Sequence, residues 1–175
     1  QGERSFAGQF TSVLDVSDVE GALAAARVVV GSVHSARALA YAARVGVDPA
    51  SLRMAVIFQE MARPRVSGVA FSRDPVTGAD EAVVEAVEGT GDALVGHGVQ
   101  PARWRVGARG VLSAPDAPPL GDGPLAEIVE TVRSVASRAR QPADVEWVWD
   151  GREVHLVQWR PITALSGTGR VWSSR

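Results

Sequence analysis

The spacing of apolar residues predicts three helices. The first begins at Asp18, which can cap the run of good helix formers from Ala22 to Ala26. The second runs from Ser35 to Val45 and ends at Gly46, where a C-cap glycine is expected. The third, from Leu125 to Arg140, places its apolar residues at the period of a helix.

Short apolar runs bounded by turn residues predict strands. Met54 to Phe58 is such a run, and we expect it to be a buried strand that forms a hairpin with Ser67 to Ser72. Asp74 to Gly78 has the composition of a turn, and a strand resumes from Glu81 to Val87. A further short strand is expected from Trp104 to Val106.

Three other segments are rich in glycine or proline and predict loops. Gly89 to Gly98 is glycine-rich, Ser113 to Gly123 is expected to be a surface loop, and Ser166 to Gly169 has the composition of a linker. The mixture of helices and hairpins favours an α+β fold, with a mainly antiparallel sheet and packed helices, over a doubly wound parallel sheet.

The segment from Asp144 to Pro161 predicts a hairpin, because Asp150-Gly151 separates two alternating runs. The register depends on the length of the loop. A two-residue loop would pair Glu146 with His155 and would turn Gln158 to the opposite face.

A three-residue loop from Asp150 to Arg152 pairs even-numbered residues with even-numbered ones and odd-numbered residues with odd-numbered ones. We prefer this loop because each face of the hairpin is then chemically uniform. One face would carry the polar residues Asp144, Glu146, Gln158 and Arg160. The other face would carry Trp147, Trp149 and Trp159, together with His155.

The four polar residues suit a site for magnesium and phosphate. Magnesium takes hard oxygen ligands, which the Glu146 carboxylate and the Gln158 amide can supply. Arg160 offers a planar fork of donors to a phosphate. Asp144 can hold Arg160 in place or contact the metal through water. The alternative from pattern alone is a solvated sheet face with ordinary salt bridges.

Composition narrows the class of protein. The content of 46% hydrophobic and 22% charged residues is that of a globular domain, and the net charge of −2 gives no reason to expect a nucleic-acid partner. No apolar run approaches membrane-spanning length and the N-terminus does not have the pattern of a signal peptide, so we expect a cytoplasmic protein without membrane contact.

The residue types that the chain lacks also limit its chemistry. It has no cysteine, and all 18 of its Lys+Arg residues are arginine. The absence of lysine means that a lysine-dependent reaction cannot be completed by this chain alone.

Five motifs in order give the sequence a resemblance to a known family. It resembles the nucleotide-binding domain of phosphoenolpyruvate synthase, pyruvate phosphate dikinase and rifampicin phosphotransferase, from about Ser5 to Thr163. The motifs are Ser5-Phe6-Ala7-Gly8-Gln9, Val56-Ile57-Phe58-Gln59-Glu60-Met61, the run from Ser67 to Gly78, Asp144-Val145-Glu146-Trp147, and the run from Val157 to Thr163.

The resemblance implies an ATP-grasp fold, which holds ATP between two subdomains. Residues 1–165 would be the C-terminal part of that domain, and residues 166–175 a linker toward a following domain. Glu146 and Gln158 would be magnesium ligands. Arg160 would contact phosphate, with Asp144 in support.

The resemblance also implies nucleotide contacts and partners. Gln59, Glu60 and Met61 would lie along the adenine, and Ser12 would be a nucleotide-contacting hydroxyl. In such enzymes the ATP phosphate passes to a histidine on a separate swivelling domain, which delivers it to pyruvate or another small-molecule acceptor.

The sequence departs from the family pattern in several places. The N-terminal subdomain, with its phosphate-binding lysine, would precede Gln1. The run Gly89 to Asp92 replaces a Gly-Leu-Gly-Glu-like run, and the swivelling domain is absent. The histidines His34, His97 and His155 are expected to be structural or on the surface, rather than phosphoryl carriers.

We therefore expect an ATP- and Mg²⁺-binding part of a phosphotransferase that is inactive on its own. The alternative is a non-catalytic interaction or regulatory half-domain derived from that family.

Overall fold

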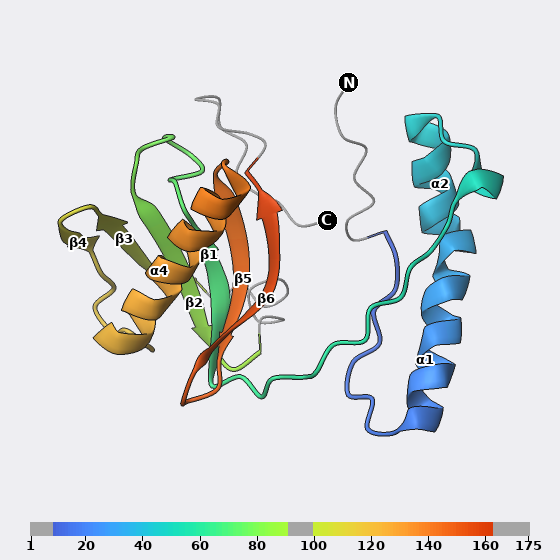
Figure 1. Ribbon diagram of the computed structural model, residues 1–175, viewed down its shortest axis with the longest axis horizontal. Coiled ribbons are helices and arrows are strands. Elements are labelled where there is room, and N and C mark those ends of the chain that lie inside the picture. Colours follow the sequence, from blue (N-terminus) through green and yellow to red (C-terminus); the bar gives the residue numbers. More distant parts are fainter. Residues whose placement is uncertain (1–8, 91–99, 163–175) are drawn as a thin grey trace. The chain divides into compact units, whose positions relative to one another are not determined.

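Figure 1 shows a computed structural model of the chain, in which residues 9–90 and 100–162 are described. The chain divides into two compact units, Gln1–Met61 and Ala62–Arg175. The first unit is helical, and the second contains the sheet.

The two helices predicted in the first unit are confirmed. Helix α1 (Val19–Gly31) is capped by Asp18, whose carboxylate accepts a 2.7 Å hydrogen bond from the backbone of Gly21. The short helix η1 (Ser32–His34) leads into α2 (Ala36–Val45), and η2 (Pro49–Ser51) follows. Gly46 ends α2 with φ of 67°, a left-handed conformation that favours glycine.

The prediction of a strand from Met54 to Phe58 is wrong. Residues 52–64 form neither helix nor strand, and Ile57 and Phe58 are 84% and 65% exposed. A strand needs a neighbour to satisfy its backbone, and the expected partner, β1 (Val66–Phe71), has both edges occupied by β2 (Ala82–Glu88) and β5 (Ala143–Trp149).

The second unit contains a six-stranded antiparallel sheet in the order β4-β3-β2-β1-β5-β6. The remaining strands are β3 (Ala102–Gly107), β4 (Gly110–Ser113) and β6 (Val154–Pro161). The predicted α+β class and mainly antiparallel sheet are confirmed. Strand β4 begins before the predicted Ser113–Gly123 loop and was not anticipated.

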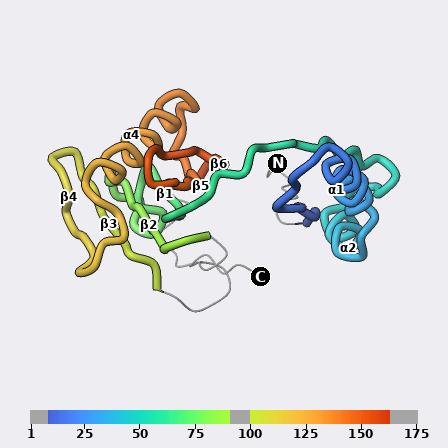
Figure 2. The backbone as a smooth tube through the Cα atoms, turned by 90° about the horizontal axis from the view of Figure 1, so that it is seen from below, coloured from blue at the N-terminus to red at the C-terminus, as the bar shows by residue number. Residues whose placement is uncertain are grey.

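The predicted third helix is present as α4 (Asp122–Ala139) and covers one face of the sheet (Figure 2). Its buried residues lie three or four positions apart and face the apolar side chains of the central strands. The core they form with the sheet includes Leu125, Ile128, Val129, Val132, Val84, Ala86, Trp104, Val145 and Trp147.

A glycine permits the closest approach in this core. Gly68 on β1 lies opposite Trp147, and a Cβ atom added at Gly68 would be 1.9 Å from the Glu85 carbonyl oxygen and 2.7 Å from Cζ2 of Trp147. The Trp147 side chain can therefore pack on β1 only because residue 68 has no side chain.

Strands β5 and β6 are joined by four residues rather than the predicted three. Trp149 pairs with Val154 and Trp147 with Leu156. Next to the turn, odd-numbered residues of β5 therefore pair with even-numbered residues of β6. A register shift follows, and Glu146 then pairs with Gln158. Val157 is therefore the extra residue of a β-bulge.

The bulge corrects one further prediction. His155 pairs with Val148, which shares its face with Glu146. His155 therefore belongs to the face opposite the tryptophans, not to the tryptophan face.

Candidate functional site

The β-bulge brings the four predicted polar residues to one face. Asp144 lies opposite Arg160, and Glu146 lies opposite Gln158. Val145 and Trp147 alternate with the two acids on β5 and belong to the core beneath α4. We call the side of the sheet that carries Asp144, Glu146, Gln158 and Arg160 the polar face.

Arg160 lies between two carboxylates of β5. Its Nε atom donates to Asp144 Oδ2 at 2.6 Å, and its Nη2 atom is 3.7 Å from Glu146 Oε1. The first contact is a short, charge-assisted hydrogen bond. The second is a looser ion pair, so Asp144 fixes the guanidinium more firmly than Glu146 does.

Exposure to solvent increases from Asp144 to Glu146. The side chain of Asp144 is 10% exposed, that of Arg160 is 32% exposed, and that of Glu146 is 41% exposed. Gln158 is also exposed. A ligand can therefore reach Glu146 and Gln158 directly, while Asp144 contacts mainly protein.

The second carboxylate oxygen of Asp144 has an unusual environment. Oδ1 is buried and accepts no hydrogen bond in the part of the chain that the structure describes. A buried acceptor of this kind normally has a partner, so the site can accept one more donor or cation.

The donor set fits a hard divalent cation. Residues directly opposite on antiparallel strands have Cβ atoms about 4.5–5.5 Å apart, so the Glu146 carboxylate and the Gln158 amide oxygen can approach one ion. Oxygen ligands of this type are those that Mg²⁺ prefers. The nearby Arg160 supplies positive charge for an anionic ligand.

The polar face continues across the sheet to two ion pairs that the sequence reasoning missed. Arg105 Nη2 lies 2.6 Å from Glu81 Oε1, and Arg103 Nε lies 3.6 Å from Glu85 Oε1. The alternation of arginine around Trp104 was the available signal, since it places both arginines on the face opposite the core.

The predicted turn from Asp74 to Gly78 is present and is held by the Asp74 carboxylate. Its Oδ1 atom accepts hydrogen bonds from the backbone of Val76 at 2.7 Å and Thr77 at 3.0 Å. Burial opposes ionisation of Asp74, but these backbone bonds and the charge of Arg103 outweigh burial and hold its pKa below the usual value.

The other predicted nucleotide contacts lie in the first unit. Ser12 and Gln59, Glu60 and Met61 are all exposed. The structure brings together the four hairpin residues of the predicted site, and the roles of Ser12 and of Gln59 to Met61 stay predictions. The Ser5 to Gly8 part of the first motif, His97 and most of the glycine-rich loop lie outside the described residues, as does the predicted linker.

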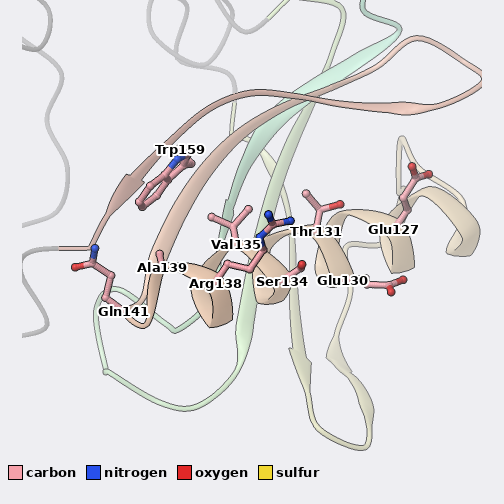
Figure 3. Close-up of a pocket in the computed structure, with 9 residues that line it drawn as sticks. All are labelled: Glu127, Glu130, Thr131, Ser134, Val135, Arg138, Ala139, Gln141 and Trp159. Carbon is pink, nitrogen blue, oxygen red and sulfur yellow. The ribbon is translucent and has the colours of Figure 1, made fainter.

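A groove of about 640 Å³ lies on the opposite side of the hairpin (Figure 3). Trp159 of β6 forms one wall, and α4 forms the other with Thr131, Val135 and Arg138. Trp159 pairs with Val145 on the core side of β5. The groove is therefore separate from the polar face.

The chain matches a known family of nucleotide-binding domains. The profile described as "Pyruvate phosphate dikinase, AMP/ATP-binding domain" matches residues 1–114, so the chain is a nucleotide-binding domain. It belongs to the pyruvate phosphate dikinase AMP/ATP-binding domain family.

Several curated proteins are similar over most of the chain. A rifampicin phosphotransferase of Streptomyces sp is 35% identical over an alignment of 188 positions, and the alignment covers 92% of this chain and 22% of that protein. A probable phosphoenolpyruvate synthase of Methanothermobacter thermautotrophicus is 30% identical over an alignment of 190 positions, and the alignment covers 93% of this chain and 28% of that protein. The chain thus spans about a quarter of the length of these relatives.

Within residues 9–90 and 100–162, no helix is both long enough and apolar enough to cross a membrane.

Proposed function

We propose that this chain binds Mg-ATP on the polar face of the β5–β6 hairpin, as part of a phosphotransferase. The observation that carries the proposal is the pairing of Glu146 with Gln158 directly beside the Arg160–Asp144 ion pair. Membership of an AMP/ATP-binding domain family supports the choice of nucleotide.

The proposal gives each of the four residues one role. Glu146 and Gln158 would hold Mg²⁺ through their oxygen atoms. Arg160 would donate hydrogen bonds to a phosphate group, and Asp144 would hold the guanidinium in position through the 2.6 Å contact. Ser12 and the segment from Gln59 to Met61 would contact the nucleoside.

These groups can assist phosphoryl transfer without forming a covalent bond to the substrate. Catalysis of this reaction depends mainly on positioning and on neutralising phosphate charge. Bound Mg²⁺ supplies two positive charges for the phosphate oxygens. Arg160 adds a fixed positive charge beside it, and its contact with Asp144 limits the reorganisation needed when the ligand arrives.

The full reaction would need groups that this chain does not contain. We propose that an N-terminal ATP-grasp subdomain completes the nucleotide site, and that a histidine on a separate swivelling domain receives the phosphate. The acceptor would be pyruvate or another small molecule. The similarity to a rifampicin phosphotransferase and to a probable phosphoenolpyruvate synthase supports this class of reaction.

Calorimetric titration with ATP, in the presence and absence of Mg²⁺, tests the proposal. We expect binding that depends on Mg²⁺ and that weakens at least tenfold, or about 1.4 kcal/mol, in Glu146→Gln or Gln158→Ala. Glu127→Gln is the matched control, because Glu127 is an exposed glutamate on α4.

Two outcomes would contradict the proposal. One is binding of ATP that is equal with and without Mg²⁺ and is unchanged in Glu146→Gln. The other is absence of binding at millimolar ATP in a chain whose circular dichroism spectrum shows that it is folded.

One observation favours a second candidate, an interaction or regulatory half-domain. Helix α1 has no buried residue, and Val19, Leu23 and Val28 are each more than half exposed. Exposed apolar surface of this kind often marks a protein contact. A chain that is an obligate oligomer and is indifferent to nucleotide would favour this candidate over the first.

A further inference from the structure

The tip of the β5–β6 hairpin is a well-defined turn. Asp150 Oδ1 accepts hydrogen bonds from the backbone of Arg152 at 2.7 Å and of Glu153 at 3.0 Å. Gly151 has φ of 101°, a conformation that favours glycine. The turn therefore holds residues 150 and 153 in a fixed relation to the start of β6.

Three side chains with metal-ligating atoms meet at this turn. Asp150 Oδ2, the oxygen that does not hold the turn, lies 3.2 Å from His155 Nε2. Glu153 Oε1 lies 3.9 Å from the same nitrogen. The three ligand atoms all lie within 4.8 Å of one another.

The two separations from His155 Nε2 are close to those of ligands around one metal ion. Zinc bonds to histidine nitrogen and carboxylate oxygen are about 2.0–2.2 Å long in a tetrahedral arrangement, so neighbouring ligand atoms lie roughly 3.3–3.5 Å apart. The two distances to His155 Nε2 lie just below and just above that range. Small rotations of the exposed Glu153 side chain would close the difference.

The chemistry of the cluster selects the kind of metal. Imidazole with two carboxylates suits zinc or a similar transition-metal ion, whereas Mg²⁺ prefers oxygen ligands alone. Three protein ligands leave one position for water. Backbone hydrogen bonds from Glu153 and Arg152, together with His155, lower the pKa of Asp150 to about 2, so the carboxylate is ionised at neutral pH.

Two arginines place positive charge near the turn. Arg152 lies within it, and a Cβ atom added at Gly151 would lie 2.8 Å from Cδ of Arg65, which therefore passes beside the turn. Positive charge near the turn weakens the binding of a cation. The affinity should therefore be lower than that of a closed structural zinc site.

We propose that Asp150, Glu153 and His155 form a transition-metal site at the hairpin tip, separate from the Glu146 and Gln158 pair. The site would take Zn²⁺ or Co²⁺ with water as the remaining ligand. The proposal does not depend on nucleotide binding.

Titration of the 175-residue chain with Zn²⁺, without nucleotide, tests the site. We expect one equivalent of Zn²⁺ to bind, with affinity reduced at least tenfold in His155→Ala and reduced in Asp150→Asn and Glu153→Gln. Asp150→Asn keeps an oxygen that can accept the hydrogen bonds of the turn. A lower Zn²⁺ affinity in this variant therefore results from the loss of the negative charge of the ligand. Circular dichroism checks that each variant is folded.

Control variants and a second readout make the test specific. His34→Ala removes a histidine of the first unit, and Glu146→Gln alters the proposed magnesium site; both should leave Zn²⁺ affinity unchanged. Bound Co²⁺ should give the visible absorption of a tetrahedral site in the unaltered chain and not in His155→Ala. No binding by the folded chain, or equal binding by His155→Ala, would overturn the proposal.

Discussion

Arg160 lies between two carboxylates that differ in their access to water. Its 2.6 Å contact is with Asp144, which is largely buried, and its 3.7 Å contact is with the more exposed Glu146. A partly buried pair is screened less than a surface pair. Asp144 therefore orients the guanidinium, while Glu146 can exchange that contact for a ligand.

Sequence alternation predicted which residues share the polar face, but not what each one contacts. Parity along β5 and β6 is a local property, so Asp144, Glu146, Gln158 and Arg160 could be grouped from the sequence. The ion-pair distances, and the buried Oδ1 atom of Asp144, depend on packing from other strands. The roles of Ser12 and of Gln59 to Met61 stay predictions.

The lowered pKa of Asp150 predicts a dependence of stability on pH. The pKa falls from 3.8 to about 2 on folding, so the ionised carboxylate stabilises the native state above pH 3.8. That contribution should be lost as the pH falls through about 2. Urea unfolding of the parent chain and of Asp150→Asn, from about pH 5 to about pH 2, should show their difference in stability shrinking.

A charge control distinguishes this effect from general acid unfolding. Asp116→Asn removes one negative charge from an exposed position between β4 and α4. The difference between the parent chain and Asp116→Asn should change less with pH. An Asp150→Asn difference that stays constant or grows as the pH falls would show that the turn does not lower the pKa of this carboxylate.

Helix α4 and the β5–β6 hairpin together determine which face of the sheet is covered and which carries the polar residues. The bulge at Val157 changes the register so that Glu146 faces Gln158, and α4 covers the tryptophan side. A four-residue connection without the bulge would have paired residues of unlike parity along the whole hairpin. The bulge is therefore the feature that keeps the four polar residues on one face.

Helix α4 should contribute strongly to stability through its buried side chains. Ile128 is 1% exposed and belongs to the core, so Ile128→Ala should lower the free energy of unfolding by about 2–5 kcal/mol. Glu127→Ala, on the exposed side of the same helix, should change it by no more than about 0.5 kcal/mol. Urea unfolding measures both, and equal effects of the two substitutions would contradict the placement of α4.

The whole chain comprises two compact units joined near Met61. The connecting residues 52–64 have no regular secondary structure, and the exposed apolar side chains of Ile57, Phe58 and Met61 lie among them. Exposed segments without backbone pairing are the usual sites of proteolysis. The unit boundary should therefore be open to protease.

Limited digestion with chymotrypsin tests this organisation. Within the described residues, the first cut should follow Phe58, which is 65% exposed, while Trp147 in the core stays protected. The C-terminal product should unfold cooperatively, because it contains the whole sheet and α4. Phe58→Ala should remove this cut. Early cleavage inside β1 or β5 would contradict the division.

The sequence alone determined the local features of this protein: the three helices, most strands, the turn at Asp74, the parity of the polar residues and the family. Each depends on periodicity or on a short motif, which operate within a few residues. Only the tertiary structure decided the strand order, the bulge at Val157, the exposure of Met54 to Phe58 and the meeting of Asp150, Glu153 and His155. The strand order and the exposure of Met54 to Phe58 depend on which strands pair, and contacts between residues far apart in the chain decide that pairing. The bulge and the meeting of Asp150, Glu153 and His155 lie within one hairpin, and they depend on the length of its connection and on its register.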